Sequence, residues 1–148
     1  MQRALLLAHL RASLGEKIAA AEADFASTLH ARNSDTKSSA GDKHEVGRAM
    51  VQQELDQQGA LLAKLRASQQ ELARVPVDRN FEHVAFGALV RTDQGLFFIA
   101  IAWGIVQVAG ATWAVVSMAS PIGQALAGKR TGDAVTVNGK TFTIEAIQ

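Results

Sequence analysis

The chain contains no cysteine and only two prolines among its 148 residues. The lack of cysteine excludes disulfide bonds, thiolate nucleophiles and cysteine-based zinc sites, and it fits a reducing compartment, so we expect a cytoplasmic protein. An excess of charge of one sign is also lacking, because 15 Lys and Arg residues stand against 14 Asp and Glu residues. Proteins that bind free DNA or RNA usually carry a basic stripe, and this balance offers none overall.

One segment without charge needs a separate interpretation. A simple hydropathy window would mark 96–119 as membrane-spanning, because it contains no charged residue. The segment is interrupted by Trp103-Gly104, Gln107, Ala109-Gly110 and Ser117, and it is rich in Ile, Val, Phe and Trp. Short runs of this kind between glycine turns are typical of buried strands, so we expect a sheet and no membrane contact. The amino terminus is expected to begin a helix, because its apolar run is short and no small-residue cleavage site follows it.

The first half of the chain carries two long helical patterns, at about 3–34 and about 42–74. In both, apolar residues recur at spacings of three and four, which forms a single narrow stripe. The first stripe consists of Leu7, Leu10, Leu14, Ile18, Ala21, Phe25 and Leu29. The second keeps a heptad spacing with two glutamines in place of leucine, and consists of Val51, Leu55, Gln58, Leu62, Leu65, Gln69 and Leu72. Two such neighbours predict an antiparallel coiled-coil hairpin of roughly 45 Å, with its tip near 38–47.

A boundary follows the second helical pattern. Pro76 ends the pattern and pushes the residue before it towards an extended conformation. We therefore expect two domains, a coiled-coil hairpin over 1–75 and a second domain over 76–148.

The second domain alternates short β-favouring runs with turn signals. The predicted strands cover 84–90, 96–101, 105–108, 112–118, 134–137 and 141–147, and turn signals occur at 93–95, 103–104, 109–110 and 138–139. Asn138-Gly139 is a strong hairpin signal, because a two-residue turn needs positive φ at both positions. One short helix is expected between the strands, with Ser120 as its cap, Pro121 at its first position and Gly128 at its end. The fold class is therefore α+β, a helical hairpin followed by a small antiparallel β domain with one helix.

The expected hairpin tip carries Asp42 and Glu45, two carboxylates three residues apart. At a helix start this spacing is a variant of the capping box, and both acids favour the positive end of the helix dipole. The same two acids could instead offer oxygen ligands to Mg²⁺, although two carboxylates alone hold that ion poorly. Both interpretations stay open, and they are compatible with each other.

Residues 120–133 read Ser-Pro-Ile-Gly-Gln-Ala-Leu-Ala-Gly-Lys-Arg-Thr-Gly-Asp. This stretch resembles the carboxy-terminal signature of the Gre transcript cleavage factors of bacterial RNA polymerase. The segment 41–45 is similar to the Gly-Asp-x-x-Glu tip of that family, and the order of a hairpin followed by a β domain is the same. The resemblance covers nearly the whole chain, and it implies an FKBP-like fold and a docking role for 76–148.

The resemblance also implies a function. Gre factors insert their hairpin into the secondary channel of RNA polymerase in the transcription complex on DNA, and the polymerase then hydrolyses the backtracked RNA 3′ end. In this chain Asp42 and Glu45 would help to hold a Mg²⁺ ion shared with the polymerase, so the chain would not be an enzyme in its own right. Ser120, Pro121 and Ile122 would contact the rim of the channel.

Three basic residues near the tip, Lys37, Lys43 and Arg48, are candidate contacts to RNA or to the acidic channel of the polymerase. Solvated charges at helix ends are an equal alternative for them. We expect the protein to act as a monomer.

Other functions remain open at this point. Val46-Gly47-Arg48 differs from the residues that follow the acidic tip in the family. Since some Gre-like proteins occupy the channel and inhibit transcription, a regulator without cleavage activity is the first alternative. A prolyl isomerase that uses the β domain is a further one, with a peptide pocket lined by Trp103, Trp113, Phe97 and Phe98. For the aromatic residues themselves, packing in the core of the sheet is the alternative role.

Overall fold

The computed structural model describes residues 2–35 and 41–148, and the environments of side chains 2–34 and 45–148. The chain divides into two compact units, which are described separately below. One unit consists of Ala12–Gln69, and the other combines Met1–Arg11 with Gln70–Gln148. The division expected from the sequence, 1–75 and 76–148, follows the ends of the helices and stays a prediction.

The two long helices are present where the sequence predicts them. α1 spans Gln2–Asp35 and α2 spans Gly41–Ala73. Each helix has an interior free of proline, and its apolar residues keep the spacing of a single helical face, which lets a long helix bury one stripe.

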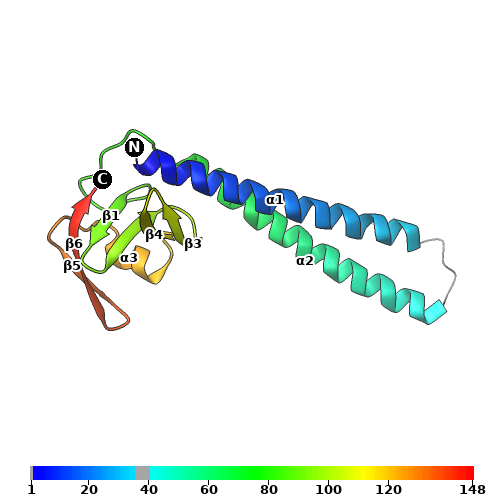
Figure 1. The fold of residues 1–148 in the computed structure, drawn as a ribbon. Coiled ribbons are helices and arrows are strands. Elements are labelled where there is room, and N and C mark those ends of the chain that lie inside the picture. Colours follow the sequence, from blue (N-terminus) through cyan, green and yellow to red (C-terminus); the bar gives the residue numbers. More distant parts are fainter. Residues whose placement is uncertain (1, 36–40) are drawn as a thin grey trace. The chain divides into compact units, whose positions relative to one another are not determined.

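Within the unit Ala12–Gln69 the two helices run side by side in opposite directions (Figure 1). Two contacts between them record the antiparallel register. Arg66 Nη2 lies 3.3 Å from Glu22 Oε1, and Arg32 Nη1 donates to Gln52 Oε1 at 3.2 Å. Among the side chains of this unit that the structure describes, the buried ones are Leu14, Ile18, Ala21, Leu55 and Leu62. The predicted stripe is wrong at Gln69, which is exposed, whereas Gln58 is half-buried and donates to Glu54 at 3.3 Å.

The other unit contains a six-stranded sheet with the order β3-β4-β2-β1-β6-β5. The strands are β1 Leu89–Thr92, β2 Gly95–Ile99, β3 Gly104–Val108, β4 Ala111–Val116, β5 Ala134–Val137 and β6 Lys140–Ile147, and the short helix α3 is Pro121–Leu126. The α+β class is confirmed. The sheet is mixed where an antiparallel one was expected, because β2 and β4 pair in parallel. After β2 the chain forms β3 at the edge of the sheet. β4 then runs antiparallel to β3, in the space between β3 and β2, and this gives β4 the same direction as β2.

The first predicted strand is displaced along the chain. The prediction was 84–90, and the strand begins only at Leu89. Before it, Val84 exchanges backbone hydrogen bonds of 2.8 Å with Lys129 O and Gly128 N, and Ala88 N closes a turn onto Ala85 O. Val84 and Ala88 are therefore buried, and Ala85 and Phe86 half-buried, in a bridge to the end of α3 and a turn rather than in a strand.

Two hairpin turns follow the sequence signals. Asn138 and Gly139 have φ values of 49° and 79°, and Ala109 and Gly110 have 53° and 78°. Positive φ at both central positions is the geometry that matches the twist of two adjacent antiparallel strands. β5 and β6 are thereby joined with Val137 opposite Lys140, and β3 and β4 with Val108 opposite Ala111.

The sheet has two faces with different partners. The main core cluster contains Val90, Phe97 and Ile99 from one face, together with Leu126 of α3. Since successive strand residues point to opposite faces, Leu89, Leu96, Phe98, Trp113 and Val115 belong to the other face. A hollow bounded by Leu5, Leu6 and Trp113 shows that the first turns of α1 lie beside that second face. No helix in the described part of the chain is long and apolar enough to cross a membrane, and segment 96–119 contributes strands, as expected.

Candidate functional sites at the hairpin tip and on the short helix

Glu45 is the first residue of α2 whose side chain the structure describes, and it is exposed. It precedes Gln52, the partner of Arg32 across the hairpin, by two helical turns, or about 10 Å of rise. α1 continues beyond Arg32 only to Asp35, which is less than one turn. Glu45 therefore lies past the last described residue of α1, on the end of the hairpin where the sequence predicts the tip.

The other predicted tip residues are described less fully. The backbone of Asp42 and Lys43 belongs to α2, but their side chains lie outside the described residues, and so does Lys37 altogether. α2 already begins at Gly41, so Asp42 is a residue of the first turn rather than the residue before it. Positions 42 and 45 are three apart in one helix, and positions at that spacing share a face.

The hairpin end offers few ligands for a metal ion. Across the described ranges, no three or more His, Asp or Glu side chains come together in a group that could hold a cation. Mg²⁺ prefers octahedral oxygen coordination and keeps several waters. The donor set of Asp42 and Glu45 therefore fits the ion only as part of a site that a partner completes.

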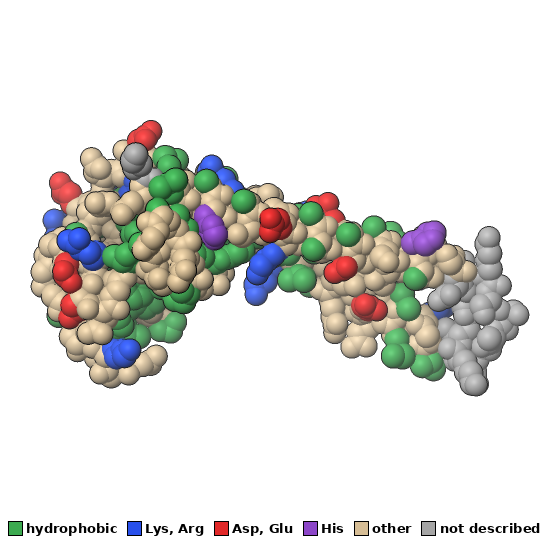
Figure 2. Space-filling model, viewed as in Figure 1, with side chains coloured by type: hydrophobic (Ala, Val, Ile, Leu, Met, Phe, Trp, Pro, Cys, Tyr) green, Lys and Arg blue, Asp and Glu red, His purple; other side chains and the backbone are tan. Residues whose placement is uncertain are grey.

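A second basic residue joins Arg48 near the tip. Arg32 of α1 and Arg48 of α2 line one shallow hollow between the helices, together with Asn33, Ala49 and Gln52. Arg48 was predicted as a candidate contact, whereas Arg32 was missed, because the two positions become neighbours only through the antiparallel register. On the face shown in Figure 2, several acidic side chains lie along the middle of the two helices, with a basic side chain beside them.

Two apolar side chains near the tip are also exposed. Val46 is 60% exposed and Met50 is 66% exposed, and one helical turn separates them on α2. Large apolar side chains exposed as neighbours are typical of a surface that contacts a partner. The hairpin end thus combines an acid, an arginine pair and an apolar patch.

The second predicted site lies at the start of α3. Ser120 is its N-cap, with Oγ accepting from Gly123 N at 3.0 Å and donating to Ser117 O at 2.7 Å. Pro121 occupies the first helical position and is exposed, and Ile122 is half-buried against the core cluster. The cap and first-turn predictions are confirmed. Ser120 is therefore engaged within the domain, and Pro121 is the residue most available to a partner.

Local contacts explain why two further positions of the 120–133 motif, Gly123 and Asp133, carry these residues. A Cβ atom added at Gly123 would lie 2.0 Å from Ser117 O, so any other residue would clash with backbone. Asp133 Oδ2 accepts from Arg130 N at 2.8 Å, which closes the turn before β5. The motif therefore shapes a rigid loop, helix and turn around Pro121.

Arg3 is a residue that no local pattern in the sequence singles out. It is 7% exposed, and its guanidinium donates to Gly87 O at 2.9 Å and to Val77 O and Arg79 O at 3.0 Å. Its Cζ lies 5.2 Å from the centroid of the Phe81 ring. Burial lowers the pKa of Arg3 from its usual value, and the charge of Asp78 partly offsets that. Arg3 ties the segment after α2 to the start of α1 inside one unit.

Comparison with known proteins identifies the carboxy-terminal region. Residues 105–148 match the family described as "Transcription elongation factor, GreA/GreB, C-term". This match includes the whole 120–133 motif and confirms the resemblance to the Gre-type factors for residues 105–148. No curated protein sequence matches the chain.

Solved structures show weaker likeness. The crystal structure of GreA factor homolog 1 (Gfh1) of Thermus thermophilus is 19% identical, with a TM-score of 0.36 over 93% of this chain and 94% of that one. Thermus aquaticus Gfh1 is 21% identical, with a TM-score of 0.33 over 91% of both chains. At identities and TM-scores this low, neither likeness carries an argument about function.

Proposed function

We propose that this chain, whose residues 105–148 belong to the C-terminal domain family of the GreA and GreB transcription elongation factors, is an elongation factor that binds RNA polymerase and promotes cleavage of backtracked RNA. The observation that carries the proposal is the combination of that domain with a helical hairpin that carries an exposed acid, Glu45, in the first turns of α2. The hairpin enters the secondary channel of the polymerase, and the carboxy-terminal domain docks at the rim.

In this proposal the ligands of the metal ion come partly from this chain and partly from the polymerase. Asp42 and Glu45 would hold a Mg²⁺ ion together with acids of the polymerase, because two carboxylates leave most of its coordination positions unfilled. When bound, the ion supplies a Lewis acid and an activated water for attack on phosphorus. The part played by this chain is to orient two oxygen ligands at the start of α2. Arg48, one helical turn after Glu45, and Arg32, which lines the same hollow as Arg48, offer positive charge to the RNA backbone.

Docking at the rim uses the short helix. Pro121 is exposed, and the Ser120 cap and the Gly123 contact hold it in a fixed place. Ile122 adds an apolar contact beside it. A surface fixed before binding loses little conformational entropy on association, which favours affinity.

A cleavage assay tests the proposal. Backtracked complexes of a bacterial RNA polymerase are incubated with the full chain, and shortening of the RNA 3′ end is followed with time. We expect Glu45→Ala and Asp42→Ala each to reduce stimulation by roughly tenfold to a hundredfold, as loss of one interaction made mainly in the transition state does. Asp24→Ala removes an exposed acid elsewhere on α1 and is the matched control. Unchanged stimulation by the double variant would refute the assigned role of the tip.

A second candidate is a regulator that occupies the channel without stimulating cleavage. The exposed Val46 and Met50 favour it, since they supply binding energy to a partner but no metal ligand. Binding to polymerase without any gain in cleavage by the parent chain selects this candidate, and Val46→Ser with Met50→Ser would then weaken binding.

A further inference from the structure

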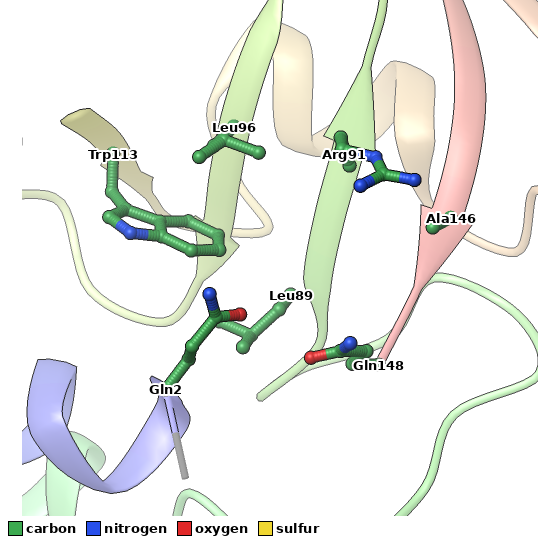
Figure 3. A pocket seen from close by; sticks show the side chains of 7 residues that line it. All are labelled: Gln2, Leu89, Arg91, Leu96, Trp113, Ala146 and Gln148. Atoms are coloured by element: carbon green, nitrogen blue, oxygen red, sulfur yellow. The ribbon is translucent and has the colours of Figure 1, made fainter. Parts of the chain in front are cut away.

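A small cavity of about 190 Å³ lies on the second face of the sheet, over strands β1, β2, β4 and β6 (Figure 3). Its apolar walls come from three strands, with Leu89 on β1, Leu96 on β2 and Trp113 on β4. Leu89 and Trp113 are each only 4% exposed, so they are fixed parts of the fold whose inner surfaces line the hollow. All residues that line it belong to one compact unit.

The size of the cavity limits its occupant. Sites for drug-sized molecules occupy about 300 Å³ or more, whereas an engineered apolar cavity of about 150 Å³ takes up a single benzene molecule. A hollow of about 190 Å³ therefore fits one bulky apolar side chain or one ring. It does not fit a nucleotide or a larger cofactor.

The rim of the cavity is polar in a specific way. Figure 3 shows the carboxamide of Gln2 below Trp113, that of Gln148 near the end of β6, and the guanidinium of Arg91 on the other side, above Ala146. Arg91 is exposed and makes no ion pair with any residue in the described ranges. The apolar walls are thus flanked by a cation without a counter-charge and by two amides that are able to bond to a peptide backbone.

An adjoining hollow adds a buried donor. It shares Leu89 and Gln148 with the first cavity and is also lined by Arg3 and Asp78. Arg3 is more than nine-tenths buried, with 7% exposure, and its Nη2 has no hydrogen-bond partner among the residues that the structure describes. Buried polar groups nearly always have one, so this N–H donor beside a hollow is available to a water molecule or to an acceptor on a partner. Since Asp78 already lies near Arg3, a neutral carbonyl oxygen suits this position better than a second anion.

We propose that this part of the sheet is a docking site for an extended peptide segment of a protein partner, in which a bulky apolar residue is followed by an acidic one. The apolar side chain fills the cavity against Trp113, and the carboxylate pairs with Arg91. A backbone carbonyl of the segment reaches the Nη2 atom of Arg3. One buried anchor with a polar rim is the arrangement that dominates the energy of many protein interfaces. The site is separate from α3 and from the hairpin tip, and it does not rest on the proposed function.

The test uses the full chain and three short peptides. The probe is acetyl-leucyl-aspartyl-glycine amide, and the matched peptides replace the aspartyl residue by asparaginyl or the leucyl residue by alanyl. Binding is followed in ¹H–¹⁵N NMR spectra through the indole N–H of Trp113 and the amide of Leu89, with the indole of Trp103 as the internal reference. We expect saturable shifts at Trp113 with a Kd on the order of 1 mM, and clearly weaker binding of both matched peptides.

Three variants separate the contributions. Arg91→Gln should weaken binding of the aspartyl peptide by roughly fivefold, as for an exposed ion pair, and leave the asparaginyl peptide unaffected. Ala146→Leu places a larger side chain in the cavity, which Ala146 also lines, and should abolish the shifts. Lys140→Gln removes a positive charge from the same unit outside the cavity, and should change nothing.

Three results would overturn the proposal. One is the absence of saturable shifts at Trp113 with the leucyl-aspartyl peptide. Another is equal binding of the aspartyl and asparaginyl peptides. The third is tighter binding of 3-phenylpropionate than of any peptide, which would reassign the cavity to a small carboxylate ligand. None of these results bears on cleavage by polymerase, so the two proposals fail separately.

Discussion

The two compact units bury apolar side chains in different ways. The hairpin unit Ala12–Gln69 buries one narrow stripe, and even there Phe25, Leu29, Val51 and Leu65 are only half-buried. The other unit covers both faces of a sheet, and Phe98, Ile99, Val90 and Leu126 are fully buried in it. A helical pair held by a thin seam tolerates change along most of its length, whereas a sheet covered on both faces does not. The comparison indicates that substitutions on the exposed faces of the two helices cost little stability.

The largest expected effect compares two phenylalanines. Phe98→Ala leaves a cavity in a closed core and should lower the free energy of unfolding by about 4 kcal/mol. Phe25→Ala in the half-open seam should cost about 1 kcal/mol, because a half-buried ring loses less apolar contact. Urea unfolding followed by far-UV circular dichroism measures both. Equal losses would contradict the stated difference between the units.

The next prediction makes one substitution in each unit, with opposite signs. Gly123→Ala forces a Cβ against Ser117 O and should destabilise by about 3 kcal/mol. Gly15 has no atom within 4 Å of an added Cβ inside α1. Gly15→Ala should therefore stabilise by about 1 kcal/mol through helix propensity. The melting temperature of each variant, compared with that of the parent protein, measures both effects. If Gly123→Ala melts at or above the parent temperature, the close approach at α3 is wrong.

The smallest expected effect concerns the ion pair that joins the two helices. The side chains of Arg66 and Glu22 are 55% and 51% exposed, and their charged atoms lie 3.3 Å apart. Because water screens such a pair, the coupling between the two residues should be about 0.5 kcal/mol or less. A double-mutant cycle of Arg66→Ala and Glu22→Ala measures it. The coupling should shrink further in concentrated salt, which screens exposed charges more strongly. A coupling as large as a core substitution would show that the hairpin depends on polar links rather than on its seam.

Local patterns predicted those parts of the fold that depend on neighbours in sequence. The bounds of α1 and α2 lie within one residue of the predicted ones, because stripe spacing and helix breakers are local properties. The Ser120 cap, the Asn138-Gly139 turn and the strand Ala134–Val137 were found for the same reason.

Features that depend on distant residues were missed. The parallel pairing of β2 and β4 follows from which strand reaches the edge, and no local signal records that order. Residues 84–88 carry a strand-like composition but bridge to the end of α3. Gln69 keeps the heptad spacing and yet is exposed.

The candidate sites divide in the same way. Glu45 and the 120–133 motif were visible in the sequence, since both are short segments with a recognisable order. Arg32 beside Arg48, and the cavity formed by Leu89, Leu96 and Trp113, bring together residues from separate helices or strands. Asp42, Lys43 and Lys37 remain predictions, because their side chains lie outside the described residues.

The sequence by itself determined two long amphipathic helices, an acidic pair at the start of the second one, and a β domain with a capped helix in the Gre-type motif. Helical spacing, caps and turns depend on interactions between residues that are close in the sequence, so a short stretch of chain is enough to specify each of them. Only the tertiary structure decided the mixed order of the sheet, the burial of Arg3 and the cavity beside Arg91. These depend on which distant surfaces exclude water together, and that choice belongs to the whole chain rather than to any one segment of it.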